Sequence, residues 1–478
     1  MSLEFLRSVL LFVSNPKSVS DPILSPERRT GFLMTGVFKR GLIWLACLAP
    51  LFYLSYGLAN YLASIRSHVP SLFFEWERSI PFIAWTIFPY WTINAFYGLS
   101  LIIARDKHEL DRHGGRLLVV QIIAVTFFVL MPLKFSFGQP PVDGAPAFLF
   151  NALRGFDQSF NQAPSLHIAL AVILWDFYQQ RIRGWFARSI LHVWTLLICV
   201  SVLTTFQHHF IDIPTGALAG MICLWLLPFG NLPNLLGQWQ WTTNPQRKKL
   251  AAYYFTAAVL LAVVAVAIGG LALVLWWGTT ALAIVALNYA GLGAQGFQKA
   301  NGSATSWASQ WLLWPHRFGA QINAWAWTRK VPAQSEVIPD LWVGRLQTTP
   351  ILGRATLNAN AYVLDLTSEF TSANGHSATD NYQSYPTLDL VVFDSIQFKE
   401  AAAKLDILWA NKSSNPNTLV MVCCALGFSR SAALVAFWLV SRKHVASLDE
   451  AIAQVRKARP QVVINEAWLE AIRAANAK

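Results

Sequence analysis

The chain has 478 residues, of which 54% are hydrophobic and only 13% are charged, whereas about 25% are charged in an average soluble domain. This composition excludes a protein that is soluble throughout, and the length leaves room for two or three domains. The formal net charge of +12 is typical of a membrane protein that retains Lys and Arg at its cytoplasmic face. No basic helix with interleaved aromatic residues accompanies the charge, so we expect no nucleic-acid partner.

Long apolar runs fill residues 41–294, which we predict to be a transmembrane domain preceded by a cytoplasmic segment, 1–40. A helix needs about 20 apolar residues to cross about 30 Å of hydrocarbon. Eight segments are candidates for such spans: 41–63, 80–104, 116–136, 165–180, 187–207, 210–229, 251–270 and 272–293. The fourth is short, and Pro214, Gly216 and Gly220 interrupt the sixth.

Positive charge predicts the orientation of these spans. The segments that would lie on one side of the membrane hold sixteen Lys and Arg, and those on the other side hold four. Because cytoplasmic segments carry the excess of Lys and Arg, we expect both chain ends in the cytoplasm. The protein is predicted to be an integral membrane protein, of the bacterial inner-membrane type.

Residues 295–332 form a third segment, in which five tryptophans are spaced along a polar stretch. Trp favours the level of the lipid headgroups, so we expect an interfacial linker that lies along the inner membrane surface. A flexible linker is the alternative interpretation.

Residues 333–478 have the sequence pattern of a soluble domain in which short strands alternate with helices. VIPDLWVG and YVLDLT resemble strands, TLVMVCC resembles a buried strand, and residues 395–411 and 447–457 resemble amphipathic helices. The pattern predicts a small α/β domain. The whole chain is therefore expected to be an all-α polytopic membrane domain followed by a soluble α/β domain.

The last of these strands runs into CCALGFSRS, which carries the first chemical motif. Five residues separate Cys424 from Arg430, which is room for a loop whose backbone N–H groups surround one phosphate. That field favours a Cys424 thiolate nucleophile, Arg430 can bind two phosphate oxygens, and Ser431 can donate to the leaving thiolate. Gly427 supplies the turn. A buried core cysteine is the alternative, but strand, glycine and helix around the motif favour the catalytic interpretation.

On these residues the segment resembles the dual-specificity branch of the protein tyrosine phosphatase family. The resemblance implies a general acid about thirty residues before the cysteine, for which Asp389 in YPTLD fits and Asp394 is a second choice. Cys423 stands where the family usually has His. Such domains act on phosphoproteins, phosphoinositides or other phospholipids, and the motif does not distinguish these substrates.

Two polar clusters at predicted membrane depth form the second candidate site, because polar groups there are costly and usually functional. APSLH contains Ser165 and His167, and QHHFID contains His208, His209 and Asp212. Both clusters would lie at the outer face. A helical turn would let Asp212 orient His208, so that one imidazole attacks phosphorus and another protonates the leaving oxygen. Zinc binding and histidines that only brace helices are the alternatives.

These clusters resemble the type 2 phosphatidic acid phosphatase superfamily, and most closely its inositol phosphorylceramide synthase branch. The resemblance implies that His208 is the nucleophile, Asp212 its orienting carboxylate and His167 the general acid. It also implies that Ser165 helps to bind phosphate.

The sequence departs from the superfamily pattern in the residues that bind phosphate. Lys134 of KFSFGQP is present, but Gln139 and Val202 replace two usual arginines. We expect Arg154 or His209 to take over the phosphate-binding role of the missing arginines. The losses leave open whether water or a lipid alcohol accepts the phosphoryl group.

These motifs favour a bifunctional membrane enzyme of phospholipid metabolism that acts on lipid phosphates and needs no metal or other cofactor. The alternative is a signalling phosphatase for phosphoproteins, with the membrane part as anchor and lipid sensor. A third reading is a transporter or lipid-binding scaffold, against which the two sets of nucleophiles and acids argue.

Overall fold

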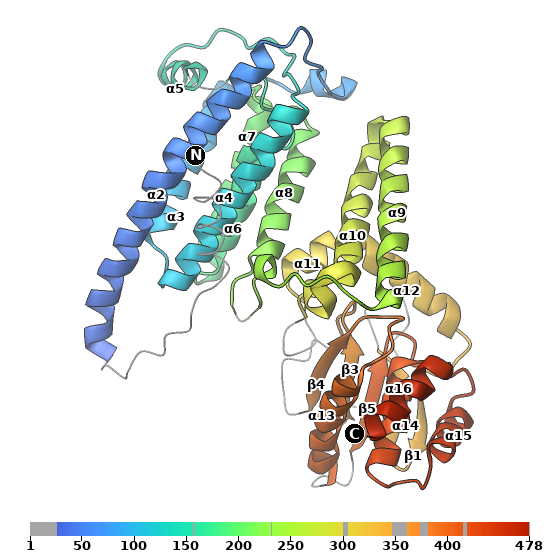
Figure 1. Cartoon of the computed structure of the whole chain (residues 1–478). Coiled ribbons are helices and arrows are strands. Elements are labelled where there is room, and N and C mark those ends of the chain that lie inside the picture. Colours follow the sequence, from blue (N-terminus) through green and yellow to red (C-terminus); the bar gives the residue numbers. More distant parts are fainter. Residues whose placement is uncertain are drawn as a thin grey trace. The chain divides into compact units, whose positions relative to one another are not determined.

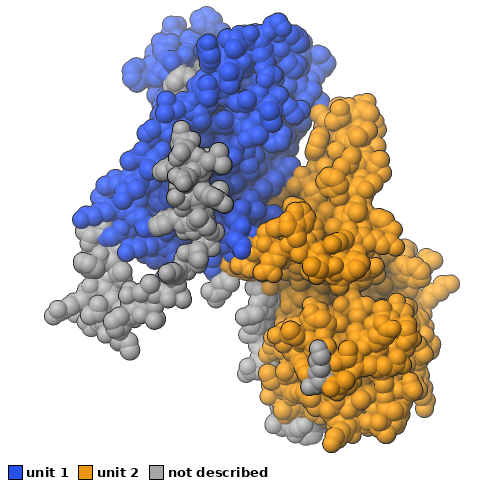
Figure 2. All heavy atoms as spheres, viewed as in Figure 1, with its two compact units in different colours: residues 1–230, 234–237 blue, residues 231–233, 238–478 orange. Residues whose placement is uncertain are grey.

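The computed structural model describes residues 26–155, 158–230, 232–299, 305–346, 361–372, 381–413 and 418–477, with the side chains from residue 36 onwards. Most of the predicted N-terminal segment 1–40 therefore lies outside the described residues. The chain divides into two compact units, residues 1–230 with 234–237 and residues 231–233 with 238–478 (Figure 2).

Unit 1 is helical, and six of the predicted spans fall on its helices (Figure 1). Its helices are α2 (Pro26–Ser64), α3 (Ile87–Ile102), α4 (Lys107–Leu130), α5 (Ala145–Arg154), α6 (Leu166–Gln179), α7 (Trp185–Thr204) and α8 (Asp212–Leu226). Short 3-10 turns are η1 (Glu75–Ser79), η2 (Ala84–Thr86) and η3 (Leu235–Gly237).

The predicted sixth span is one unbroken helix, α8. Pro214 lies in its first turn, where the missing N–H costs nothing. A Cβ atom at Gly216 would lie 2.5 Å from the carbonyl oxygen of Ser165, and one at Gly220 would lie 2.9 Å from that of Ala169. The glycines thus let α8 and α6 approach closely, as small residues do between membrane helices, and they do not interrupt α8.

Among the described residues, five helices are long and apolar enough to cross a membrane: Gly36–Ser64, Lys107–Leu130, Trp185–Thr204, Pro245–Ile268 and Gly270–Phe297. The helices α3, α6 and α8 are shorter. The predicted number of eight spans and their orientation stay predictions.

Unit 2 begins with a helical hairpin, α9 (Pro245–Ile268) and α10 (Leu275–Leu287), joined by η4 (Gly270–Val274). The hairpin leads through η5 (Asn288–Leu292) and η6 (Gly293–Phe297) into α11 (Trp307–Leu312) and α12 (Trp314–Thr328). The Trp-rich segment is thus largely helical. Trp277 of α10 stacks on Trp311 and Trp314, at ring separations of 5.0 and 5.4 Å. These contacts explain why the hairpin, which we assigned to the domain 41–294, groups with unit 2.

The rest of unit 2 is the predicted α/β domain, whose first strand begins at Gln334. The described part of its sheet has the strand order β1-β2-β5-β3-β4, with β1 (Gln334–Ile338), β2 (Leu341–Arg345), β3 (Ala361–Thr367), β4 (Tyr382–Thr387) and β5 (Leu419–Cys424). The pair β1–β2 is antiparallel and the other pairs are parallel. The helices are α13 (Ser395–Ser413), α14 (Arg430–Ser441), α15 (Leu448–Ala458) and α16 (Glu466–Asn476).

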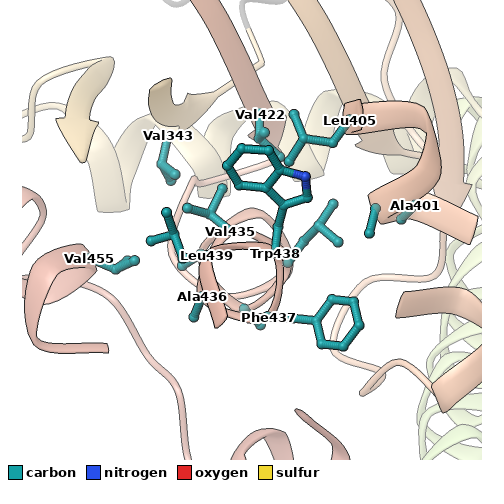
Figure 3. Close-up of a cluster of buried hydrophobic side chains, with 14 of the residues drawn as sticks. Val343, Ala401, Leu405, Val422, Val435, Ala436, Phe437, Trp438, Leu439 and Val455 are labelled. Carbon is teal, nitrogen blue, oxygen red and sulfur yellow. The ribbon is translucent and has the colours of Figure 1, made fainter. Parts of the chain in front are cut away.

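Strand β5 and helix α14 form the centre of this domain. Figure 3 looks along α14, with Val422 of β5 and Leu405 of α13 on the same side of the Trp438 indole. Trp438 is 1% exposed, and its indole N–H donates to the Asp406 carboxylate at 2.7 Å. An aromatic side chain of this size buries a large apolar area. This core therefore fixes both elements that flank the loop from Cys424 to Arg430.

Candidate active sites

The loop between β5 and α14 forms the cradle that the sequence predicts. The N–H of Gly427 donates to the Sγ of Cys424 at 3.2 Å, and the Ser431 hydroxyl lies 3.3 Å from the same sulfur. Gly427 has φ +74°, and a Cβ atom there would lie 2.5 Å from the carbonyl carbon of Gly344. Only glycine fits this turn without strain. The cradle therefore presents donors to an anion at Sγ, which suits a thiolate nucleophile.

The Arg430 guanidinium lies beside this cradle and is 1% exposed. Its Nη2 donates to Glu369 Oε1 at 2.7 Å and lies 3.0 Å from Asp389 Oδ1, while Nη1 donates to the Thr387 carbonyl at 2.9 Å. Among the described residues, its buried Nε has no hydrogen-bond partner. Burial opposes the Arg430 charge, but Asp389 and Glu369 raise its pKa well above the ordinary value. A permanently charged guanidinium with a free donor suits phosphate binding.

Between the two candidate acids, the structure brings Asp389 and not Asp394 to Arg430. The Asp394 carboxylate instead accepts from the N–H groups of Ile396 and Gln397 at the start of α13, at 2.9 and 2.8 Å. The Asp389 side chain is 44% exposed. Its pKa is nevertheless raised, first by burial among its neighbours, against the opposing effect of Arg430 and with a contribution from Glu369. A raised pKa suits a general acid, which must carry its proton.

Replacing Asp389 by Asn is expected to slow the hydrolysis of alkyl phosphates by about 10²- to 10³-fold. The acid works while protonated, so activity should fall as pH rises through its raised pKa, and the variant should lose this alkaline limb. The check is a pH profile of kcat/KM with both proteins. Asp394→Asn is the control and should keep the wild-type profile. An unchanged alkaline limb in Asp389→Asn would assign the limb to another group.

Two charged residues of this site escaped the sequence analysis. Burial alone would raise the pKa of Glu369, but Arg430 holds it below the ordinary value. Arg459, at the C-cap of α15, donates to the carbonyls of Leu426 and Pro332, at 3.1 and 2.8 Å. Burial lowers its pKa to about 10. Arg459 thus ties the phosphate loop to the start of the domain. The available signal for Glu369 was its place two residues after a buried strand, whereas nothing local marks Arg459.

Cys423, the departure from the family pattern, points away from the cradle. Neighbouring strand residues face opposite sides of a sheet, and the Cys423 thiol donates to the Leu364 carbonyl at 3.5 Å in a separate apolar cluster. Burial, aided by Asp365, raises its pKa well above the ordinary value. Cys423 is therefore a buried neutral thiol beside the site.

The second candidate site forms where α6 begins and α7 gives way to α8. Nε2 of His208 lies 3.2 Å from the Ser165 hydroxyl, and its Nδ1 lies 3.1 Å from Asp212 Oδ2. All three residues are buried. If Nδ1–H donates to the carboxylate, Nε2 is left unprotonated, as a nucleophile requires. The structure thus brings His208 to Asp212, as their spacing predicts, and places Ser165 on the other ring nitrogen of His208.

His167 lies near this chain of bonds but does not join it. Its ring stacks on Tyr90 at 3.9 Å, and its buried Nε2 has no hydrogen-bond partner among the described residues. His167 and His208 both line one cavity of about 190 Å³. A second cavity, of about 270 Å³, is lined by His208, Arg154 and Gln139, and Arg154 donates to the Gln139 amide oxygen at 3.2 Å. A phosphate beside His208 would share the first cavity with the His167 imidazole or the second with the Arg154 guanidinium.

Two of the predicted phosphate-binding residues are placed differently. Lys134 is exposed and is not among the residues that line either cavity. The His209 ring is held by the Glu77 carboxylate at 3.0 Å and the Ser136 hydroxyl at 3.1 Å, and it stacks on Phe135 at 4.3 Å. Glu77 is 1% exposed and was missed because its partner is 132 residues away. Within the described ranges, no three His, Cys, Asp or Glu side chains are grouped as metal ligands.

Comparison with known proteins bears on the C-terminal site. Residues 357–478 match the family model of the dual specificity phosphatase catalytic domain. Tk-PTP in its active form is 18% identical over 31% of this chain and 99% of that one, with a TM-score of 0.24. PTPMT1 in complex with PI(5)P is 18% identical over 30% and 95%, with a TM-score of 0.25. Human DUSP28 is 18% identical over 30% and 94%, with a TM-score of 0.22. On the family model, the C-terminal part of this chain carries a dual-specificity-type catalytic domain, that of a phosphoric monoester hydrolase.

Proposed function

We propose that this protein is a bifunctional membrane enzyme of phospholipid metabolism. The Cys424 site removes a phosphate monoester from a phospholipid on the cytoplasmic side, and the His208 site cleaves or transfers a lipid phosphoryl group on the outer side. The observation that carries this proposal is that one chain assembles two separate nucleophile sites. One is a loop in which the Gly427 N–H donates to Cys424 and which ends at the buried Arg430, and in the other His208 bonds a buried Asp212.

At the C-terminal site, the Cys424 thiolate attacks phosphorus and forms a phosphocysteine. Arg430 holds the phosphate oxygens, and Asp389 gives its proton to the departing oxygen. Water then attacks the phosphocysteine, the Asp389 carboxylate takes the proton of that water, and the thiolate leaves with help from the Ser431 hydroxyl. Inorganic phosphate and an alcohol are the products.

At the His208 site, Nε2 attacks phosphorus while Asp212 holds Nδ1, and the His167 imidazole protonates the leaving oxygen. The phosphohistidine then transfers its phosphoryl group to water or to a lipid alcohol. Ser165 and Arg154 would contact the phosphate oxygens. The hydrogen-bonded chain from Ser165 through His208 to Asp212 supports this assignment.

The full-length protein in phospholipid micelles tests the substrate class. We expect phosphate release from phosphatidic acid or a phosphoinositide to exceed release from a phosphotyrosine peptide, when each is compared by kcat/KM. A strong preference for the peptide would instead favour the signalling phosphatase. Stoichiometric phosphate binding with no covalent phospho-enzyme on Cys424 or His208 would favour the scaffold and contradict both.

A further inference from the structure

The loop that carries Asp389 is bound by a residue from outside the phosphatase domain. The Tyr289 hydroxyl donates to the Asp389 carbonyl oxygen at 2.9 Å, across 100 residues of sequence. Tyr289 belongs to η5, a π-helical turn at the end of α10, and is 3% exposed. The hairpin of α9 and α10 therefore reaches the backbone of the general acid.

The peptide group between Asp389 and Leu390, whose carbonyl Tyr289 binds, is followed by a backbone conformation that is uncommon. Leu390, the residue after Asp389, has φ +58°, a region that bulky side chains rarely adopt. The Leu390 side chain is 63% exposed, so its own packing does little to hold this conformation. The Tyr289 hydroxyl donates to the carbonyl of the peptide group that joins Asp389 to Leu390. This hydrogen bond opposes a rotation of that peptide group, which would carry the loop away from Arg430.

Tyr289 is itself rigidly placed. Its ring stacks on Tyr254 of α9, with centroids 5.5 Å apart and an interplanar angle of 15°. Tyr254 in turn meets the His316 ring of α12 edge to face at 5.7 Å. The Arg247 guanidinium donates through Nε to the Tyr289 carbonyl at 3.1 Å. A hydroxyl held from two helices can fix its acceptor better than a mobile surface group can.

We infer that Tyr289 is a positioning residue of the phosphatase reaction, through which the apolar hairpin holds the general-acid loop beside Arg430. This inference rests on the proposed function of the Cys424 site. It adds that the catalytic unit is larger than the phosphatase domain and includes η5. The hydroxyl acts through the backbone of Asp389 and does not itself contact the reacting atoms.

The hairpin also relates this loop to the membrane surface. The apolar part of α9, from Leu250 to Ile268, is about 28 Å long at about 1.5 Å per residue, which matches the hydrocarbon thickness. Arg247, Lys248 and Lys249 precede it, as basic residues do at a cytoplasmic membrane edge. Because Arg247 binds the Tyr289 carbonyl, Tyr289 and the acid loop belong at the headgroup level. A phosphate on a lipid headgroup fits that position.

The experiment compares Tyr289→Phe with the wild-type full chain in phospholipid micelles, on two soluble substrates. Hexyl phosphate needs its leaving oxygen protonated, whereas the phenolate of p-nitrophenyl phosphate leaves more readily without a proton. We expect kcat for hexyl phosphate to fall roughly five-fold, as the loss of one hydrogen bond predicts. For p-nitrophenyl phosphate the fall should be at most about two-fold, and KM should be unchanged for both.

Tyr253→Phe is the matched control, since Tyr253 lies on α9 next to Tyr254 but is 60% exposed. It should match the wild type on both substrates. Asp389→Asn is the benchmark and should show the same difference between substrates at larger amplitude. Phe at position 289 keeps the ring that packs on Tyr254 and removes only the hydroxyl.

Two results would overturn the inference alone. An equal fall in kcat on both substrates would mean that the Tyr289 hydroxyl stabilises the packing of the hairpin on the phosphatase domain without orienting the acid. No fall in kcat on either substrate would mean that the hydrogen bond does not contribute to turnover. Absence of any Cys424-dependent hydrolysis by the wild type would overturn the proposed function as well. A five-fold loss confined to hexyl phosphate supports the assignment.

Discussion

Replacing Cys424 by Ser is expected to abolish phosphate-monoester hydrolysis, with kcat lower by a factor on the order of 10⁴ or more. The loss follows from the nucleophile itself, because a serine hydroxyl stays protonated where a thiol can ionise. The cradle around residue 424 consists of the Gly427 N–H and the Ser431 hydroxyl, and neither can take a proton from serine as a base would. Phosphate binding should survive, since Arg430 and the loop are unchanged. The measurements are phosphate release and trapping of radiolabelled phospho-enzyme by the purified full chain.

Cys423→Ser is the matched control for this variant. The two cysteines are adjacent on β5, but Cys423 lies in the apolar cluster on the other side of the sheet and bonds the Leu364 carbonyl. A serine there can keep that bond, so we expect activity within about two-fold of the wild type, with some loss of stability from the buried hydroxyl. If Cys423→Ser and Cys424→Ser lost activity equally, a general packing defect would explain both. If Cys424→Ser retained full hydrolysis in a His208 variant, the nucleophile would lie elsewhere.

The parts of the C-terminal site that lie close together in sequence were predictable. From Cys424 to Ser431 the chain makes one strand end, one turn and one helix start, and each has a local signal: the buried strand, Gly427 and the apolar helix that follows. The spacing of His208 and Asp212 likewise predicts their contact on a helical turn. The contact forms, but His208 lies in the connection between α7 and α8, and only Asp212 belongs to α8. Local signals were therefore enough to predict the surroundings of Cys424 and His208, whose roles as nucleophiles stay predictions.

The partners that come from distant parts of the chain were not predictable in this way. Glu369 reaches Arg430 across 61 residues and Tyr289 reaches the Asp389 backbone across 100. Nothing in the spacing of one sequence indicates which strand ends meet or which helix a loop will contact. At Gly216 a local signal was present but misleading, because glycine predicted an interruption of the helix that the structure does not have. Close packing against α6 outweighs the helix propensity of glycine there.

Replacing His208 by Asn is expected to remove the second activity, the cleavage or transfer of a lipid phosphoryl group, by a factor on the order of 10³ or more. An asparagine amide can still donate to Asp212, so the buried carboxylate keeps a partner, but the amide offers no nucleophilic nitrogen in place of Nε2. The experiment uses the Cys424→Ser background, which silences the other site. Release or transfer of phosphate from a lipid phosphate in micelles is measured there, together with the melting temperature.

The His208→Asn result also separates the catalytic interpretation from that of a bracing histidine. A brace needs only the bond to Asp212, which Asn preserves, so bracing predicts retained activity and at most a small change in melting temperature. A nucleophile predicts lost activity at a similar melting temperature, and no labelled phosphohistidine. His192→Asn is the control, because His192 is an exposed histidine of α7 outside the site and its loss should leave turnover unchanged. Asp212→Asn should give a smaller loss than His208→Asn, because it leaves the attacking nitrogen in place and removes only the carboxylate that orients it.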